Sequence, residues 1–377
     1  MCFLAASVGI PALTASAGTI LVPQQYPTIQ AGINAAGDGD VVVVAAGTYT
    51  GAGNRDLNLM GKAITLRSAS GPGTCIINAQ ATVNDQHSVF VISGGETRAT
   101  VIDGFTITGG YSFNGAGVYV AHGDVTVQNC VITGNDCACW GGGVYVESAS
   151  QPRFVNCRIV GNTSTDEGGG VFTVASGSPV FEGCVISNNS ARIGGGICTF
   201  WGTTRFVDCI VASNTAEYYA GGAYLWGGEM SNCTVAGNSG NMWEYGSAAY
   251  LGGNAAISNS IIWGNGPGSQ LYDGGTATVR YSIVEGGFVG VGNRADDPRF
   301  VDPLAGDFRV SRTSPAIDAG SNLLVFPGNT HDIAGRPRFY DEQLVVDSGQ
   351  GSGPIVDMGA FESAPLFMPS RRQPSQR

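Results

Sequence analysis

The chain has 377 residues and a net charge of −11, with 18 Lys or Arg against 29 Asp or Glu. Its acidity disfavours a nucleic-acid partner, since phosphate would be repelled, and it disfavours polyanionic glycans unless a metal ion or local arginines bridge the repulsion. Hydrophobic residues make up 43% of the chain and charged residues only 12%, which excludes a disordered protein. No apolar run reaches the roughly 18 residues that predict a membrane span.

Residues 1–17 predict a signal peptide. Residues 2–17 are apolar and end in Ala15-Ser16-Ala17, an A-x-A cleavage pattern. The positively charged segment that usually precedes such an apolar stretch is absent, so a buried N-terminal strand is the alternative. We expect export, and therefore a secreted or cell-surface protein.

Two short elements alternate through the middle of the chain. One reads VQNCVITGN at 127–135, and variants of it follow at 154–162, 181–189, 206–214, 230–238 and 257–265. The other is Gly-rich, as in GGGVYV at 141–146, and recurs every 26 or 27 residues. A period of this length, built from short β-rich segments, predicts an all-β solenoid with three strands in each coil.

Three rows of residues repeat with the coils. The first is expected to form tight corners, because most of its members tolerate a left-handed backbone; it comprises Asp103, Asn129, Asn156, Gly183, Asp208, Asn232, Asn259 and Tyr281. The second could hydrogen-bond from coil to coil; it comprises Asn135, Asn162, Asn189, Asn214, Asn238 and Asn265. The third is predicted to hold free thiols in the core; it comprises Cys130, Cys157, Cys184, Cys209 and Cys233.

On the strength of these rows, residues 20–290 resemble the right-handed parallel β-helix of the pectate-lyase-like superfamily. The segment 20–51 resembles the N-terminal part of that family, where an amphipathic helix covers the open end of the core. Here that helix would span about Thr28–Ala36, with Ile29 and Ile33 on one face. The resemblance thus implies a right-handed parallel β-helix over 18–290. It does not by itself imply an activity, because many functions share the fold.

Residues 291–363 are expected to form a C-terminal capping module. The motifs DPRFVDPLAGDFRVSRTSPAIDAGSN (297–322), DIAGRPR (332–338) and VDMGAFE (356–362) resemble a module that follows β-helices in secreted bacterial proteins, where it usually precedes a surface anchor. Here a polar, basic tail at 364–377 follows, and we expect it to be disordered. We interpret the module's charged residues as an internal ion-pair network, with bound Ca²⁺ as the alternative; they are Asp318, Asp332, Asp357, Arg336 and Arg338.

The Gly-rich strand predicts an aromatic stripe on the outer surface. Alternate residues of a strand face opposite ways, so the residues between its inward valines should face out. Aromatic rings suit the apolar faces of sugars, which predicts a surface that follows a glycan along the axis; the alternative is that the rings only cover the sheet. The stripe comprises Tyr119, Tyr145, Phe172, Tyr224 and Tyr250, with Cys198 between them.

The segments that lead into this strand are expected to be loops along one edge of the same face. They lie at 135–140, 162–167, 188–193, 214–219 and 238–245. Their aromatic residues are Trp140, Tyr218, Tyr219, Trp243 and Tyr245. Their charged residues include Asp136, Asp166, Glu167, Arg192, Glu217 and Glu244. In the pectate-lyase-like superfamily the catalytic cleft is formed by this strand and its flanking loops, so the resemblance implies a candidate site here.

Two enzymatic chemistries and one non-enzymatic function remain open. A polyuronate lyase, which the resemblance favours among the enzymes, would bind Ca²⁺ through Asp136, Asp166 and Glu167 and use Arg192 as the base. A glycoside hydrolase would use two carboxylates, for example Glu167 with Glu217. The regular coils with short loops fit equally well a non-catalytic adhesin or glycan-binding scaffold. We expect a monomer that binds extracellular polysaccharide. If the protein is an enzyme, it would also cleave that polysaccharide.

Overall fold

The structure is a computed structural model of the chain, and it describes residues 17–241 and 245–363. Three segments lie outside the described residues. They are residues 1–16 of the expected signal peptide, residues 242–244, which include Trp243 and Glu244, and the tail at 364–377. No helix among the described residues is long and apolar enough to cross a membrane.

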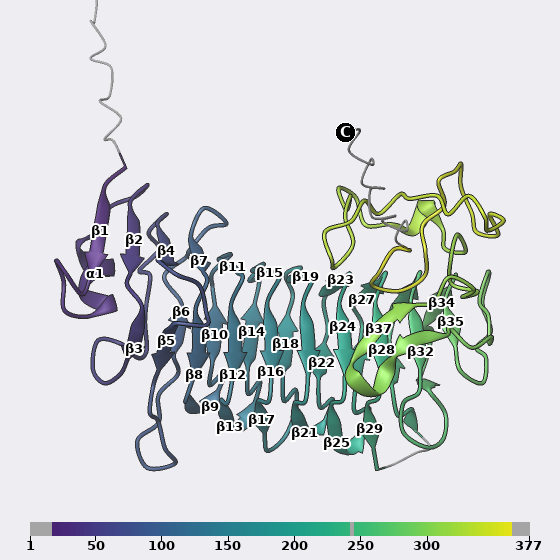
Figure 1. Cartoon of the computed structure of the whole chain (residues 1–377). Helices are drawn as coiled ribbons and strands as arrows, with labels where there is room; N and C mark the ends of the chain where they lie inside the picture. Colours follow the sequence, from purple (N-terminus) through teal and green to yellow (C-terminus); the bar gives the residue numbers. More distant parts are fainter. Residues whose placement is uncertain (1–16, 242–244, 364–377) are drawn as a thin grey trace, which may run out of the picture.

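Short parallel strands stack into an elongated solenoid (Figure 1), which confirms the predicted fold class. Each strand pairs with the equivalent strand of the next coil, and successive coils build three long sheets. Sheet A comprises β1 (Thr19–Val22), β2 (Val41–Val44), β4 (Thr65–Ser68), β7 (Val101–Asp103), β11 (Thr126–Gln128), β15 (Arg153–Val155), β19 (Val180–Glu182), β23 (Arg205–Val207), β27 (Glu229–Ser231), β31 (Ala256–Ser258) and β34 (Thr278–Arg280). Sheet B comprises β3 (Gly47–Tyr49), β5 (Cys75–Asn78), β8 (Thr106–Thr108), β12 (Val131–Thr133), β16 (Arg158–Val160), β20 (Val185–Ser187), β24 (Ile210–Ala212), β28 (Thr234–Ala236), β32 (Ile261–Trp263) and β35 (Ile283–Val284).

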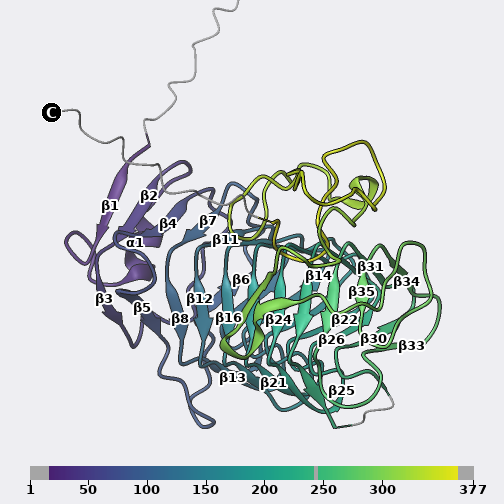
Figure 2. The same cartoon turned by 45° about the vertical axis from the view of Figure 1, so that its right-hand side comes forward.

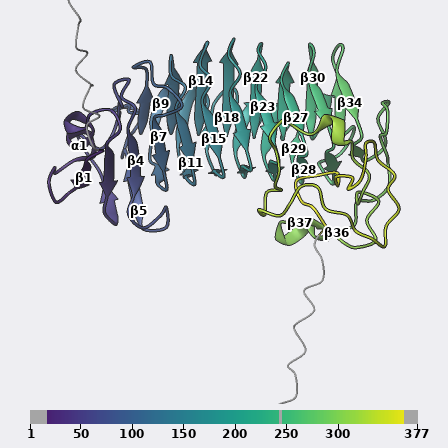
Figure 3. The ribbon, with the colours of Figure 1, turned by 90° about the horizontal axis from the view of Figure 1, so that it is seen from above.

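Sheet C is formed by the Gly-rich element, and its strands lie side by side along the axis (Figure 3). It comprises β6 (Phe90–Ile92), β10 (Val118–Ala121), β14 (Val144–Ser148), β18 (Val171–Ala175), β22 (Ile197–Phe200), β26 (Ala223–Trp226), β30 (Ala249–Gly252) and β33 (Leu271–Asp273).

The segments expected to be loops instead form a fourth parallel sheet, which we call the edge sheet. It comprises β9 (Tyr111–Asn114), β13 (Asp136–Trp140), β17 (Thr163–Ser164), β21 (Ser190–Ile193), β25 (Thr215–Tyr219) and β29 (Ser239–Gly240). Neighbouring coils present these segments in register, so their backbone groups satisfy one another across coils. A single coil carries no hydrophobic alternation here, and the sequence pattern therefore gave no sign of a strand.

The core is built from residue rows that run along the axis. The rings of Phe154, Phe181 and Phe206 are fully buried and stack with centroids 4.8 and 5.0 Å apart. The predicted cysteine row lies beside them, buried and free of disulfides, as expected. Burial raises the pKa of the Cys130 and Cys157 thiols, so these groups act as small hydrophobic side chains.

The corner row has the predicted left-handed backbone, with one exception. Asn129 and Asn156 each have a φ of +52°, and Asn232 has a φ of +51°. Asp103 was expected in this row, but it pairs with Gln128, and the corner of its coil is Gly104 with a φ of +79°. The sequence pattern aligns Asp103 with the Asn row, whereas the strand register places the following glycine at the turn.

The second asparagine row forms a hydrogen-bonded ladder inside the solenoid. The side-chain amide of Asn162 donates to Asn189 Oδ1 at 3.1 Å, and that of Asn189 donates to Asn214 Oδ1 at 3.0 Å. The same Oδ1 atoms accept the backbone N–H groups of the preceding coil, at 3.0 Å for Asn162. Every buried amide therefore has partners on both sides, which makes the ladder a source of stability.

One helix covers the N-terminal end of the core, as predicted. Helix α1 (Ile29–Ala35) begins after Thr28, whose hydroxyl accepts the Ala31 N–H at 3.2 Å. Ile29 and Ile33 are fully buried and belong to the main core.

The C-terminal module lies along the side of the last coils (Figures 1 and 2). It contains a hairpin of β36 (Phe300–Asp302) and β37 (Asp307–Val310) and two 3-10 helices, η2 (Pro303–Ala305) and η3 (Asn322–Leu324). Phe308 and Ala360 pack on Ile210 and Ala212 of sheet B. The module thus covers an outer face of the solenoid.

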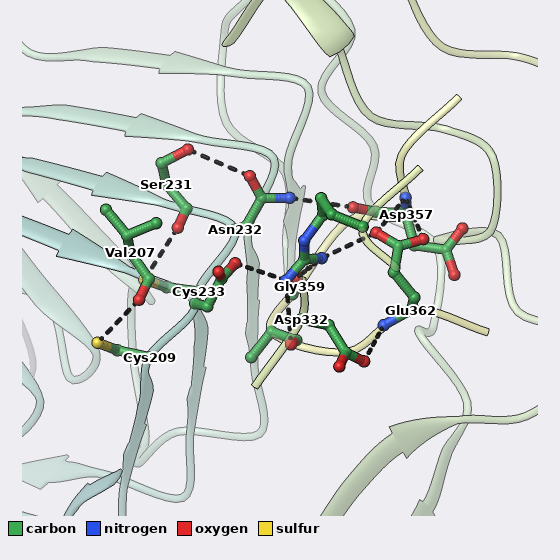
Figure 4. Close-up of polar contacts among 12 residues, drawn as sticks. Val207, Cys209, Ser231, Asn232, Cys233, Asp332, Asp357, Gly359 and Glu362 are labelled. Atoms are coloured by element: carbon green, nitrogen blue, oxygen red, sulfur yellow. Dashed lines mark hydrogen bonds and ion pairs between the residues drawn. The ribbon is translucent and has the colours of Figure 1, made fainter. Parts of the chain in front are cut away.

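A buried polar network joins the module to the solenoid. The Arg338 side chain is fully buried and pairs with Glu362 and with Asp208 at a corner of the solenoid. Figure 4 shows Asp332 accepting the Glu362 N–H, at 2.9 Å, and the Asn232 amide reaching the Asp357 carbonyl. Of the five residues interpreted as an ion-pair network, Arg338 alone forms ion pairs among the described residues, and its partners Asp208 and Glu362 were not among the five. Asp332 and Asp357 instead accept backbone N–H groups, from Glu362 and Ser363.

Candidate functional site

The aromatic stripe lies on the outer face of sheet C. Val118 and Val120 are fully buried in the core, so Tyr119 between them faces away from it. The strand register aligns the stripe in the order Tyr119, Tyr145, Phe172, Cys198, Tyr224, Tyr250 and Tyr272. Tyr272 was not predicted, because the repeat fades near residue 270, although the Leu-Tyr-Asp pattern at 271–273 keeps the same alternation.

The first half of the stripe is packed and covered. Tyr145 and Phe172 are each only 3% exposed, and their rings stack at 5.4 Å. The Trp140 ring from the edge sheet stacks on Phe172 at 5.8 Å. The hydroxyls of Tyr119 and Tyr145 donate to the Glu147 carboxylate at 2.7 and 3.0 Å. Tyr145 and Phe172 therefore offer no open ring face to a sugar, and their predicted binding role is replaced by packing.

The second half of the stripe is more open. The rings of Tyr224 and Tyr250 stack at 4.6 Å, and those of Tyr250 and Tyr272 stack at 5.1 Å. The edge sheet adds Tyr219, and the segment after it adds Tyr245, which meets Tyr272 at 5.1 Å. We call this group the aromatic band; it comprises Tyr219, Tyr224, Trp226, Tyr245, Tyr250 and Tyr272. All of its members are partly exposed, with Trp226 at 36%.

Next to the aromatic band, the edge sheet carries an ion pair. Arg192 Nε donates to Asp166 Oδ1 at 2.7 Å, and the Arg192 guanidinium lies over the Tyr218 ring at 5.8 Å. Hydrogen bonding to Asp166 raises the pKa of Arg192. A raised pKa opposes loss of a proton, so this arrangement works against Arg192 as a catalytic base.

Among the acids on and beside the edge sheet, Glu167 has the most strongly raised pKa. Its backbone lies between those of Trp140 and Ile193 in neighbouring coils. Burial and the neighbouring Asp166 raise the pKa of Glu167 to about 7, against a smaller opposite effect of Arg192. The Glu167 charge also contributes to the raised pKa of Tyr224, which indicates that the carboxyl group lies near the stripe.

The predicted Ca²⁺ ligands do not come together. Asp136 pairs in register with Thr163, three residues before Asp166, and strand residues are about 3.3 Å apart. Within the part of the chain that the structure describes, the carboxylates of Asp136, Asp166 and Glu167 do not form a group whose oxygen atoms lie within 4.8 Å of one another. The edge sheet therefore does not fit the expected metal, and no catalytic step is assigned to it.

Glu217 is exposed on β25, two coils beyond Glu167 in the register that runs through Ile193 and Tyr219. It makes no salt bridge within residues 17–241 and 245–363. It is thus available as a second carboxylate near the aromatic band.

A sizeable cleft lies elsewhere on the molecule. It measures about 590 Å³ and separates a corner of the solenoid from residues 328–335 of the module. Asn156, Arg158, Glu182 and Asp208 line its solenoid side. None of the residues predicted for the site lines this cleft.

Comparison with known proteins supports the same architecture. Residues 62–239 match the family model described as "Right handed beta helix region". The fold is similar to that of pectate lyase Pel9A, with 17% identity over 89% of this chain and 91% of that chain, at a TM-score of 0.52. A weaker similarity, with a TM-score of 0.43, is to pectin methylesterase PemA from Erwinia chrysanthemi, at 14% identity over 80% of this chain and 99% of that chain. No curated protein sequence matches the chain.

The coils, the family match and the similarity to pectate lyase define the class of protein. The chain folds as a right-handed parallel β-helix built from repeated coils, and it shares this fold with pectate lyase Pel9A. This confirms the resemblance inferred from the repeats. A shared β-helix fixes the scaffold, and the activity has to be argued from the site.

Proposed function

We propose that the chain is an extracellular protein that binds polysaccharide along the aromatic band. The observation that carries this proposal is the stack of Tyr224, Tyr250 and Tyr272, one partly exposed ring in each of three successive coils. Aromatic rings favour the apolar faces of sugar rings, and their hydroxyl groups can hydrogen-bond to sugar hydroxyls. Successive coils are about 4.8 Å apart, close to the length of one sugar unit, so a chain lying along the axis would meet one ring per unit.

The charge distribution favours a neutral glycan. The chain has a net charge of −11, and Arg192, which lies over Tyr218, is already paired with Asp166. The negative net charge would therefore repel a polyuronate, and Arg192 offers no unpaired guanidinium to offset that repulsion. The lyase alternative also needs Ca²⁺ ligands and a free arginine, and the edge sheet supplies neither arrangement.

Hydrolysis is a second candidate function, and one observation favours it. A carboxyl group with a pKa of about 7, such as that of Glu167, is partly protonated at neutral pH. This is the property required of the general acid in glycoside hydrolysis. Glu217, exposed on the neighbouring part of the edge sheet, would be the second carboxylate.

Binding is tested by affinity electrophoresis and calorimetry on neutral glucans, xylans and mannans and on polygalacturonate. We expect a neutral polysaccharide to bind, and Tyr250→Ala and Tyr272→Ala each to weaken binding at least tenfold. Phe339→Ala, which removes a 41% exposed ring from the C-terminal module, is the matched control and should bind normally. Binding that survives both tyrosine changes would contradict the proposal.

Cleavage is followed on the same polysaccharides. New reducing ends that are lost in Glu167→Gln would support the hydrolase. Unsaturated, ultraviolet-absorbing products would instead point to a lyase and contradict the assignment of Glu167 as an acid. Binding without any product would leave a glycan-binding scaffold.

A further inference from the structure

The C-terminal module contains one acidic residue that the polar network does not satisfy. Asp318 is fully buried, yet neither of its carboxylate oxygens has a hydrogen-bond partner among the described residues. Burial, followed by the charges of three nearby aspartates, raises the pKa of Asp318 to about 7, and the Glu342 backbone N–H opposes this rise without making a hydrogen bond to either oxygen. Asp318 was interpreted as a member of the ion-pair network, and in this respect the interpretation is wrong: Arg338 pairs with Asp208 and Glu362 instead.

Its backbone is held firmly in place. The Asp318 N–H donates to Asp357 Oδ1 at 2.8 Å, and the Asp318 carbonyl accepts the N–H groups of Ser348 and Gly349 at 2.9 and 3.1 Å. The main chain at Asp318 has a left-handed φ of +49°. The backbone and the Cα–Cβ bond of Asp318 are therefore fixed by the fold, while its carboxylate has no hydrogen-bond partner among the described residues.

Two further carboxylates meet the Asp318 side chain. One oxygen from each of Asp318, Asp341 and Asp347 lies within 4.8 Å of the other two. Asp341 and Asp347 are exposed and lie at the two ends of the segment 341–347. None of the three forms a salt bridge with a described residue, so their negative charges repel one another uncompensated.

We infer that Asp318, Asp341 and Asp347 bind a Ca²⁺ ion that ties the segment 341–347 to the core of the module. Two oxygens that ligate one Ca²⁺ at 2.3–2.6 Å can be at most about 5 Å apart, which the observed spacing satisfies. The ion would bind the buried Asp318 carboxylate, which has no hydrogen-bond partner among the described residues.

The chemistry of the three ligands favours Ca²⁺ over other metals. All three are carboxylates, and the group contains neither the His nor the Cys that zinc sites typically use. Two of the ligands are solvent-exposed, so water can complete the shell of 6–8 oxygens that Ca²⁺ accepts. Mg²⁺ requires near-ideal octahedral geometry at shorter distances and is a poorer fit to a loop closed by three acids.

The site is separate from the aromatic band and from the edge sheet. Its three residues all come from the C-terminal module. Gly353 lies beside the Asp347 carboxylate, where a Cβ atom would be 3.2 Å from Asp347 Oδ2. Glycine at this position thus keeps the space beside the Asp347 carboxylate open.

The test uses the full chain after treatment with chelator. Calcium chloride is titrated by calorimetry, and the midpoint of thermal unfolding is measured with Ca²⁺, with Mg²⁺ and with chelator alone. We expect one Ca²⁺ per chain, a higher midpoint with Ca²⁺ than with Mg²⁺, and at least tenfold weaker binding in Asp347→Asn and Asp318→Asn. Asp347 is exposed, so Asp347→Asn remains informative if Asp318→Asn fails to fold.

Two matched controls separate this site from other acids. Asp296→Asn removes an exposed carboxylate of the same module and should bind Ca²⁺ normally, as should Asp166→Asn on the edge sheet. Two results would overturn the inference: a wild-type chain that neither binds Ca²⁺ nor gains stability from it, or full binding by Asp318→Asn and Asp347→Asn. Loss of binding in Asp166→Asn alone would overturn it as well and would return the ion to the edge sheet.

Discussion

Arg338 Nη1 donates to Glu362 Oε1 at 2.9 Å, and neither side chain has any exposed surface. Arg338 also reaches Asp208, which lies 130 residues earlier at a corner of the solenoid. One guanidinium therefore joins two carboxylates that belong to different parts of the fold. This contact fixes how the C-terminal module sits on the β-helix.

Removal of the Arg338 side chain should destabilise the docked module. Arg338→Met leaves two buried carboxylates without a cation, and breaking one side of such a pair typically costs about 3–5 kcal/mol. Chemical denaturation should show this loss, or a separate early transition for the module. Arg309→Met is the control: its partner Asp307 is on the surface and Arg309 is 51% exposed, so less than about 1 kcal/mol is expected. Equal effects of the two changes would contradict the role of Arg338.

The asparagine ladder should be sensitive to the loss of a single amide. Asn189→Ala removes an acceptor for both the side chain and the backbone N–H of Asn162, and it removes the donor to Asn214. Unsatisfied buried groups cost about 1–3 kcal/mol each. We expect a clear decrease in the free energy of unfolding, whereas Asn84→Ala at an exposed turn should change it little. A ladder variant as stable as the wild type would show that water replaces the lost contacts.

The two halves of the aromatic stripe should respond differently to truncation. Tyr145→Ala removes a buried ring stacked on Phe172 and should cost about 3 kcal/mol of stability. Tyr250→Ala removes a partly exposed ring and should cost about 1 kcal/mol, while it weakens glycan binding. Unfolding and binding measured on both variants distinguish packing from recognition. Loss of binding without loss of stability in Tyr145→Ala would contradict this division.

Glu167 should make the stability of the chain pH-dependent. Its pKa is raised from 4.5 to about 7 in the folded state, so folding favours the protonated form. The fold therefore loses stability as the pH rises from about 4.5 to 7, and the loss is absent below that range. We expect Glu167→Gln to be more stable than the wild type by roughly 1 kcal/mol at pH 8, less than the full shift implies because solvent screens the carboxylate. The two proteins should be equally stable near pH 4.

The matched control for this experiment is Glu217→Gln, which changes an exposed acid of the same sheet. Its unfolding free energy should follow that of the wild type at every pH. A Glu167→Gln variant that is less stable than the wild type at pH 8 would show that the carboxylate makes a favourable contact in its ionised form.

The cysteines should differ in reactivity according to their burial. Cys139 is the one partly exposed thiol among the described residues, and burial together with Asp166 and Glu167 raises its pKa. Peptide mapping after brief alkylation of the native chain should show Cys139 labelled first, more readily at higher pH. The stacked thiols, such as Cys157 and Cys209, should react only after unfolding. Rapid labelling of the stack in the native chain would contradict its burial.

The repeat pattern by itself determined the solenoid. The 26-residue period, the corner asparagines and the alternating valines are local signals that recur in every coil, and each copy reinforces the same register. For the same reason the cysteine row and the asparagine ladder could be predicted, whereas the helix at the N-terminal end was expected from the family resemblance and from Ile29 and Ile33 on one face. A row is visible in sequence whenever the residues that stack in space are also equally spaced along the chain.

The tertiary structure decided what the repeat does not encode. The edge sheet forms only because neighbouring coils pair, so a single copy shows no strand signal. Tyr145 is buried and Tyr250 is partly exposed although both occupy the same repeat position, because Tyr145 belongs to a buried cluster with Phe172 and Cys198 against which Trp140 packs, and Tyr250 does not. The pairing of Arg338 with Asp208 and the isolation of Asp318 depend on contacts across long sequence separations, which no local pattern predicts. The sequence thus determined the scaffold and its periodic surface, and tertiary packing decided which residues of that surface remain free to bind.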